Sequence, residues 1–393
     1  MQQLSGSLAL SSSGAYMVPN VEAHWAGVES PRVRIDRESD FRQVLAALSG
    51  HVVVDTRRGL VVQGDSLELL RLIPTNSISL IVTDPPYHST KKANITGDRG
   101  FEVDEHYLEW MERYAQEWHR VLRRNGSLYL FCSTEMSARL EIEVGKHLRP
   151  LSHITWTKPN GPGFDGWKGK MQKEALRRWY PHSERILFFE QASLDHERRS
   201  SLGALLREAR DQAGVSAHEL TGAIGAYGKV NHGGAVSNWE TGRNIPSREQ
   251  WAKIVEVLEA TGRVRDLPAY EDAVRPFFLS KHVDFMDVWE FPSVRVYRGK
   301  HPAEKPISLL SHIVETSSYA GDLVLDCFSG SGASLGAAVG VNRRAVGIEL
   351  DPHWATRSAE RLVRADDAIA VTTVRQLKAR RDQKAAQGAE PLF

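Results

Sequence analysis

The chain has few cysteines, no long apolar run and almost no net charge, and each absence excludes a class of protein. Cys132 and Cys327 are the two cysteines among 393 residues, so we expect neither a disulfide framework nor a metal cluster. No stretch is apolar enough over a sufficient length to span a membrane, and the N-terminus lacks the pattern of a secretory signal. We therefore expect a protein of the reducing cytoplasm.

Composition sets further limits. The formal net charge is +1, so any basic surface that binds nucleic acid must be local. An apolar content of 41% is ordinary for a globular protein, and the length suffices for two domains. Residues 1–50 match no motif and are read as an N-terminal extension, while residues 374–393 form a basic tail.

The tetrapeptide Asp84-Pro85-Pro86-Tyr87 directly follows an apolar run, residues 78–83, which reads as a buried strand. The two prolines fix φ and remove two N–H donors, so the turn is stiff and presents acceptors only. The Asp84 carboxylate and the Pro85 carbonyl can each accept a hydrogen bond from an exocyclic amino group, while Tyr87 stacks on the flat ring that carries this group. Taken alone, the tetrapeptide fits a plain turn equally well.

A second pattern is a strand, a loop of small residues and a helix within residues 324–340. Glycines in the loop let the backbone approach a ligand, and the start of the following helix offers free N–H groups. A further strand ends at Glu349, which lies 23 residues after Asp326, near the ~20-residue spacing of a carboxylate that binds a ribose. The loop Phe328-Ser329-Gly330-Ser331-Gly332 does not complete the Gly-x-Gly-x-x-Gly pattern typical of NAD sites.

Together these motifs resemble the DNA amino-methyltransferases, which methylate adenine N6 or cytosine N4 with S-adenosylmethionine. The resemblance assigns the glycine loop to the cofactor, Glu349 to its ribose and Asp65 to its adenine, although Asp65 also fits a helix N-cap. The segment His301-Pro302-Ala303-Glu304-Lys305-Pro306 resembles one that lies beside the methionine end of the cofactor. The implied cofactor-binding residues are Asp65, Lys305, Asp326, Phe328, Ser329, Gly330, Ser331, Gly332 and Glu349.

The order of the motifs carries information, because the Asp-Pro-Pro-Tyr segment precedes the glycine loop. In the family this circularly permuted order marks the β group. It implies a Rossmann-like α/β sheet made of a catalytic half, residues 51–195, and a cofactor-binding half, residues 264–373. Trp156 falls in a segment that resembles the lining of the pocket for a flipped base.

Residues 196–263, between the two halves, read as an all-α insert of short helices, the last of them from residue 248 to 260. Ser216 and Glu219 have the spacing of a capping box at the start of one of these helices. The stretch from Val236 to Ser247 resembles the recognition helix and exit loop of a Cro/repressor helix-turn-helix, which implies a target-recognition insert. Since such domains put the start of the second helix into the major groove, the base-contact candidates are Asn231, His232, Ser237 and Asn238. The insert carries nine Lys/Arg and eight Asp/Glu, so a neutral protein-binding bundle stays open.

Two other segments are candidates for contact with double-stranded DNA. Residues 166–182 combine aromatic side chains with a basic set that suits backbone binding and base stacking: Lys168, Lys170, Lys173, Arg177 and Arg178. A solvated basic helix explains this segment equally well. Lys91 and Lys92 belong to a polar loop, residues 88–100, that we expect to close over the flipped base.

The sequence thus predicts a site-specific DNA methyltransferase that acts on adenine N6 by base flipping, with Asp84 to Tyr87 as the catalytic segment. Adenine is preferred because family members with Asp at the first position lean towards it. The alternatives are cytosine N4, a DNA-binding regulator on an inactive scaffold, and an RNA or protein-glutamine methyltransferase. Methylation of cytosine C5 is excluded because neither cysteine follows a proline. A homodimer and a cognate restriction endonuclease stay open.

Overall fold

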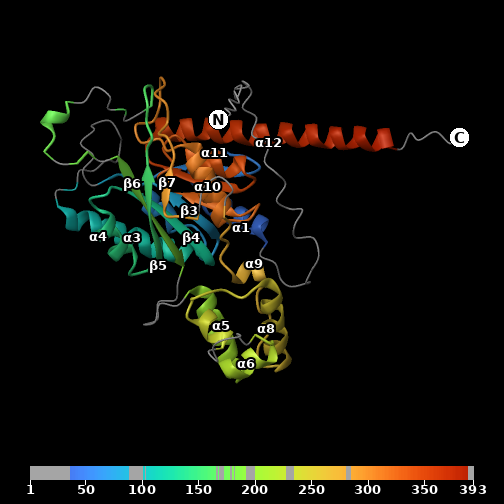
Figure 1. Cartoon of the computed structure of the whole chain (residues 1–393). Coiled ribbons are helices and arrows are strands. Elements are labelled where there is room, and N and C mark those ends of the chain that lie inside the picture. Colours follow the sequence, from blue (N-terminus) through green and yellow to red (C-terminus); the bar gives the residue numbers. More distant parts are fainter. Residues whose placement is uncertain are drawn as a thin grey trace, which may run out of the picture.

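The computed structural model describes residues 36–87, 101, 103–164, 167, 172–177, 179–180, 182–191, 200–226, 234–279 and 285–387, with side chains to residue 369. In these residues the chain forms a mixed α/β fold around one central sheet (Figure 1). None of the described helices is long and apolar enough to cross a membrane. The predicted α/β fold class is confirmed.

The central sheet has nine strands in the described part of the chain, in the order β1-β2-β9-β8-β3-β4-β6-β5-β7. Strands β2, β9, β8, β3 and β4 are parallel, whereas β1 and β6 run antiparallel to their neighbours. The strands are β1 (Val52–Asp55), β2 (Gly59–Gln63), β3 (Ile78–Thr83), β4 (Leu122–Cys132), β5 (Leu148–Thr157), β6 (Ser183–Gln191), β7 (Val288–Glu290), β8 (Leu323–Asp326) and β9 (Arg344–Glu349).

Strands β3 and β8 lie side by side, although some 240 residues of sequence separate them. From β3 the chain continues through α3 to β4 on one side, and from β8 it continues through α11 to β9 on the other. The strand order therefore reverses between them. In open α/β sheets, ligands bind beyond the carboxyl ends of the strands at such a point.

Helices cover both faces of the sheet (Figure 1). One face packs against α1 (Arg37–Ala47), α2 (Ser66–Leu70), α3 (Asp104–Val121) and α4 (Ser137–Val144). The other packs against α10 (Ile307–Ser317), α11 (Ala333–Gly340) and the first part of α12 (Pro352–Gln387), whose second part projects from the body. The alternation of strand side chains divides the apolar core into these two layers.

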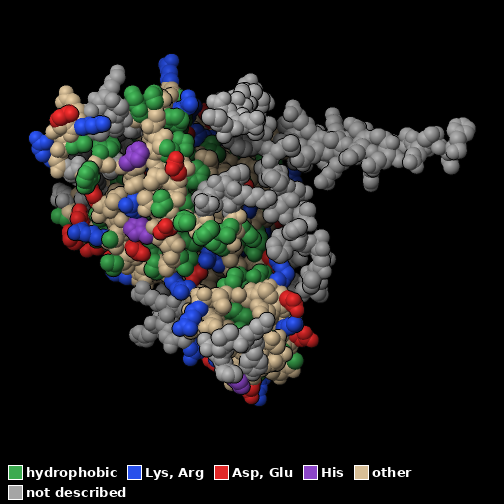
Figure 2. Space-filling model, viewed as in Figure 1, with side chains coloured by type: hydrophobic (Ala, Val, Ile, Leu, Met, Phe, Trp, Pro, Cys, Tyr) green, Lys and Arg blue, Asp and Glu red, His purple; other side chains and the backbone are tan. Residues whose placement is uncertain are grey.

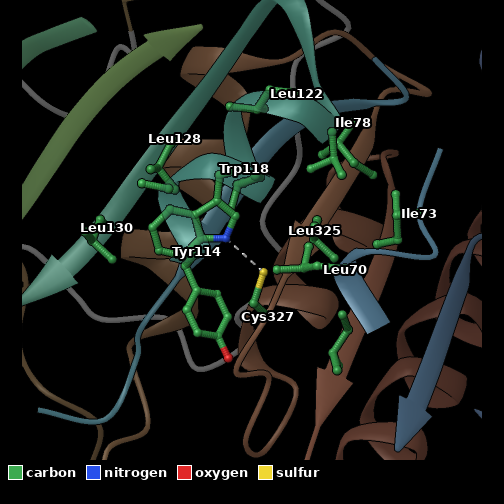
Figure 3. Packing of buried hydrophobic residues seen from close by; sticks show 14 of the residues in the cluster. Leu70, Ile73, Ile78, Tyr114, Trp118, Leu122, Leu128, Leu130, Leu325 and Cys327 are labelled. Atoms are coloured by element: carbon green, nitrogen blue, oxygen red, sulfur yellow. Dashed lines mark hydrogen bonds between the residues drawn. The ribbon is translucent and has the colours of Figure 1, made fainter. Parts of the chain in front are cut away.

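Helix α3 shows how the sequence produces this packing. Tyr107, Met111, Tyr114 and Trp118 recur at intervals of three and four residues, so one stripe of the helix is apolar and buried. Acidic residues in its first turn and basic residues in its last turn complement the helix dipole. The indole N–H of Trp118 lies 3.3 Å from the Cys327 sulfur, which joins α3 to the end of β8 (Figure 3).

A separate helical unit, which we define as α5 to α9, inserts between β6 and β7. It consists of α5 (Ser201–Ala213), α6 (Ala217–Ala223), α7 (Ala235–Glu240), α8 (Arg248–Ala260) and α9 (Tyr270–Ala273). The expected capping box of Ser216 and Glu219 is present. Val264, Leu267 and Val274 complete its own core, so the unit extends beyond residue 263, where the sequence pattern ended it.

The helical unit is attached to the end of the sheet opposite the carboxyl ends of β3 and β8 (Figure 1). The Ser201 hydroxyl donates to the Gln191 carbonyl at the end of β6, at 2.7 Å. Asn125, near the start of β4, donates to the carbonyl of Glu271 at 2.8 Å. Because β6 runs antiparallel to β4, both attachments lie at the amino ends of the parallel strands.

Candidate functional site

A cavity of about 220 Å³ opens at the carboxyl ends of β3, β8 and β9. It brings together all four residues of the Asp-Pro-Pro-Tyr segment and eight of the nine predicted cofactor-binding residues. These eight are Asp65, Lys305, Asp326, Phe328, Ser329, Gly330, Ser331 and Glu349. Segments far apart in the sequence therefore meet at the point where the strand order reverses.

Asp84 is placed at the cavity by the period of two in β3. Leu80 and Val82 pack into the layer under α10 and α11, and Asp84 continues on that side of the sheet. Its Oδ2 accepts from the Lys305 ammonium, and its buried Oδ1 has no hydrogen-bond partner among the described residues. Burial raises the pKa of Asp84, while the Lys305 charge counteracts that effect.

Lys305 lies next to Asp84, although the sequence assigned it to the cofactor alone. Its Nζ lies 3.6 Å from Glu184 Oε2 and 5.6 Å from the centre of the Tyr87 ring. Burial disfavours the ammonium, but the carboxylates of Asp84 and Glu184 outweigh that penalty and raise the pKa of Lys305. Lys305 is therefore charged at neutral pH.

Glu184 and Lys158 were missed by the sequence analysis. The Tyr87 hydroxyl donates to Glu184 Oε2 at 3.0 Å, and Lys158 forms an ion pair with Glu184 Oε1. The two lysines hold the pKa of Glu184 below its usual value in spite of burial. The available signal was an acid two residues before the apolar run 186–189, on the side of the strand that also carries Ile186 and Phe188.

The glycine loop is held under the cavity by Asp326. Its Oδ1 accepts from the Thr83 hydroxyl and the Phe328 N–H, each at 3.1 Å, and its Oδ2 accepts from the Ser334 hydroxyl. Burial raises the pKa of Asp326 to about 6. The described contacts of this predicted cofactor residue therefore fix β3, the loop and α11 to one another.

Two glycines of the loop adopt the left-handed backbone region that other residues avoid. Gly330 has φ 48°, and a Cβ there would lie 3.3 Å from the His301 ring. Gly332 has φ 73° and forms the N-cap of α11, where a Cβ would meet Ser358 at 2.7 Å. Gly332 does not line the cavity but determines the path of the backbone beneath it.

Glu349 lies at the cavity wall at the end of β9. Its Oε2 accepts from the Gly330 N–H at 2.7 Å and its Oε1 from the Asp351 N–H at 2.9 Å. Burial raises the pKa of this carboxyl, and the two N–H bonds oppose that change. Each oxygen keeps acceptor capacity that can receive a ligand hydroxyl.

The cavity also has an aromatic wall, and most of it was not predicted. Between ring centres, Phe328 lies 5.2 Å from Tyr114 and 5.8 Å from Trp110, and Phe101 lies 5.5 Å from Trp110. All four side chains line the cavity. Asp65 caps α2 at the same wall by accepting from the N–H groups of residues 67 and 68, so its capping role is confirmed.

The predicted DNA-binding residues are distributed differently. Lys173 and Arg177 are exposed in the connection from β5 to β6, near Trp179, which is 95% exposed. Trp156 is 2% exposed and donates to the Phe291 carbonyl, so it belongs to the core and does not line the cavity. Its place in the alternation of β5 determines this burial. Outside the described residues lie Lys91, Lys92, Lys168, Lys170, Arg178, Asn231 and His232.

In the helical unit, Ser237 is exposed and Asn238 partly exposed on α7. Trp239 is buried in the core of the unit. Figure 2 shows Lys/Arg and Asp/Glu side chains interspersed on the visible face of this unit. Its surface therefore shows no single sign of charge on that face.

Comparison with known proteins identifies related sequences. The family model described as "DNA methylase" (N6_N4_Mtase) matches residues 78–360. The DNA adenine methyltransferase YhdJ of Escherichia coli is 26% identical over 77% of this chain and 82% of its own length. The type II methyltransferase M.HpaI of Haemophilus parainfluenzae is 24% identical over 76% and 72%. The structure of PvuII DNA methyltransferase, named as cytosine-N4-specific, is similar at a TM-score of 0.48 and 16% identity, over 79% of this chain and 88% of its own.

Proposed function

Since the chain belongs to the N6/N4 DNA methylase family, whose methyl donor is S-adenosylmethionine, we propose that it methylates adenine N6 in duplex DNA at specific sites. The observation that carries this proposal is the buried Oδ1 of Asp84, an acceptor with no hydrogen-bond partner among the described residues. It lies at a cavity shared with Pro85, Tyr87 and the glycine loop. The exocyclic amino group of a base would supply the hydrogen-bond donor that Asp84 Oδ1 lacks.

The cavity has features that fit the proposed cofactor. Its aromatic wall, with Phe328, suits a purine, and the acceptor capacity of Glu349 suits ribose hydroxyls. At Gly330 a side chain would approach the His301 ring, so glycine leaves space for a ligand beside the backbone. When bound, S-adenosylmethionine supplies an electrophilic methyl group.

The residues of the chain would act on the amino group of the base. Its lone pair is conjugated into the ring, which makes it a weak nucleophile. The amino group would donate one hydrogen bond to Asp84 Oδ1 and one to the Pro85 carbonyl, which would draw the nitrogen towards sp³ geometry, while Tyr87 would stack on the ring. The charge of Lys305 beside Oδ2 favours the ionised form of Asp84. Positioning and electrostatic stabilisation supply the acceleration.

Base flipping follows from the burial of these acceptors, because an amino group within a duplex cannot reach them. Flipping costs a few kcal/mol of stacking and pairing. Two observations support adenine over cytosine: the Asp at the first position of the tetrapeptide and the adenine specificity in the name of YhdJ. The cytosine specificity named for PvuII makes N4 the second candidate.

Two surfaces would contact DNA. The connection from β5 to β6, with Lys173, Arg177 and Trp179, leaves the sheet at the same end as Asp84 and would contact the duplex near the flipped base. The helical unit would bind as a helix-turn-helix through Ser237 and Asn238. The length of β6, about 26 Å, separates the two ends of the sheet, so the unit would read base pairs about eight or more positions from the flipped base.

The assembly and biological setting are also proposals. M.HpaI is named a type II methyltransferase, which supports a role beside a cognate restriction endonuclease. One helix-turn-helix per chain would suit either a monomer or a two-fold homodimer. Light scattering of the purified chain with and without DNA would distinguish these states.

Transfer of labelled methyl from S-adenosylmethionine to mixed-sequence duplex DNA, followed by nucleoside mass spectrometry, tests the proposal. We expect N6-methyladenine. Detection of N4-methylcytosine would support the same mechanism but with cytosine as the target base. Cofactor binding without transfer to DNA would favour the regulator or, if RNA alone were methylated, an RNA methyltransferase.

A further inference from the structure

We propose that Glu184 is a positioning residue of the transfer site, which orients both Tyr87 and Lys305 around Asp84. This inference rests on the proposed function. Glu184 does not line the cavity, so its action would pass through side chains that do. Three contacts on one carboxylate carry the argument: the Tyr87 hydroxyl, the Lys305 ammonium and the Lys158 ammonium.

The first effect concerns Tyr87. Its ring lines the cavity, and its hydroxyl donates to Glu184 Oε2 at 3.0 Å. A tyrosine ring can turn about two side-chain torsions, and a bond at its far end restricts both. Glu184 would therefore hold the ring in the orientation in which its face meets a base.

The second effect concerns Lys305, whose ammonium has three hydrogens to donate. Asp84 Oδ2 receives one, the Ala303 carbonyl lies at 3.4 Å, and Glu184 Oε2 lies at 3.6 Å. These three acceptors draw the ammonium away from Asp84 Oδ1, which is left without a partner. Without the charge of Glu184, Lys305 could shift towards Oδ1 and occupy the acceptor that the amino group needs.

Lys158 completes the charge balance. Two carboxylates, Asp84 and Glu184, face two ammonium groups, Lys305 and Lys158, so the group as a whole is neutral. Lys158 Nζ also lies 4.5 Å from the centre of the Trp156 ring, which anchors it to the core. This cation gives Glu184 a partner of its own, and Glu184 can remain charged beside Asp84.

The arrangement makes a prediction for pH dependence. The titratable groups that face Asp84 come from several elements: Lys305, Glu184, Tyr87, Tyr107, Cys132 and Asp326. Burial raises the pKa of Asp84, Lys305 lowers it, and the negative charge of Glu184 raises it. Because Asp84 must be ionised to accept from an amino group, neutralising Glu184 should move the acid limb of activity to lower pH.

The test compares Glu184→Gln with Glu190→Gln in the full chain. Glu190 lies on the same face of the same strand and is more deeply buried than Glu184, but it pairs with Arg149 and Arg275 and does not line the cavity. We expect Glu184→Gln to slow single-turnover methyl transfer about 10- to 100-fold, to shift its acid limb downwards and to leave cofactor affinity within about threefold, as loss of a positioning contact would. The control should change thermal stability without moving the pH profile.

Glu184→Asp and a double-mutant cycle with Tyr87→Phe keep the test decisive if the first variant folds poorly. The Asp variant retains the charge and should keep the acid limb near that of the wild type while transfer stays slow. In the cycle, the two losses should be less than multiplicative because they remove one shared contact. Wild-type rates and an unmoved acid limb in Glu184→Gln would overturn the inference. If the wild type itself methylates no DNA, the proposed function fails instead.

Discussion

Replacing Asp84 by Asn changes one oxygen to an amide and leaves the shape of the site intact. Lys305 can only donate, so the amide oxygen of the new side chain must face the ammonium. The NH₂ group then takes the place of Oδ1. It is a donor, and so is the amino group of the base that would bind there, so the two cannot form a hydrogen bond. Asn should therefore be no better than Ala, although it is isosteric with Asp.

The size of the effect follows from what is lost. A hydrogen bond to a charged acceptor contributes about 1.5–3 kcal/mol. Loss of one preorganised electrostatic group in an active site typically slows catalysis about 10²- to 10³-fold. With an opposed donor in addition, we expect Asp84→Asn to slow transfer by about 10³-fold or more, equivalent to about 4 kcal/mol of barrier.

The assay is single-turnover transfer of labelled methyl at saturating cofactor and DNA, with calorimetric measurement of cofactor binding. Asp84→Ala should also abolish transfer, and both variants should bind S-adenosylmethionine within about threefold of wild type, since the main described contact of Asp84 is with Lys305. An Asn variant that retained a tenth or more of the wild-type rate would refute the acceptor role of Oδ1.

Three other predictions concern stability and recognition. Gly332→Ala forces a left-handed residue against Ser358 and should destabilise the fold by about 2–4 kcal/mol and weaken cofactor binding, whereas Gly340→Ala, which meets no atom within 4 Å, should be neutral or stabilising in thermal denaturation. Burial beside Lys305 lowers the pKa of His301 to about 4, so the unfolded chain gains a proton near 6.5 before the folded chain does. The free energy of unfolding should fall by up to about 3 kcal/mol as pH drops from about 6.5 to about 4. In His301→Gln, chemical denaturation should show a smaller loss of unfolding free energy over the same pH range. Deleting residues 200–274, which removes the whole helical unit with its core, should spare cofactor binding but remove sequence preference in methylation of mixed-sequence DNA. Unchanged preference would assign recognition to the connection from β5 to β6.

The sequence predicted the sheet and the convergence of its two main motifs because both depend on local patterns. The strand before Asp84, the glycine loop and the helix after it each follow from apolar runs and small residues within about ten positions. Chain order then required only that parallel strands bring their carboxyl ends together. The predicted helix from residue 248 to 260 and the capping box at Ser216 are local in the same sense.

What sequence could not give were contacts that depend on register between distant strands. Glu184 meets Tyr87 only because β4 pairs with both β3 and β6 and so brings the end of β3 close to the start of β6, and neither register is encoded near these residues. The alternation of side chains along β5 buries Trp156, whose motif had suggested that it lines a pocket. Trp110 and Tyr114 line the cavity because α3 packs beside the end of β8, and the residues of α3 alone do not indicate that neighbour.

The position of the helical unit, at the end of the sheet opposite the cavity, has a consequence for how methylation sites would be chosen. If the unit binds DNA as proposed, it acts as an anchor, and a base about eight or more pairs away is presented to the cavity at a raised effective concentration. Methylation would then depend on the length and stiffness of the DNA between anchor and base, as well as on its sequence. Short duplexes that carry the methylated base but end before the anchor segment would be poor substrates.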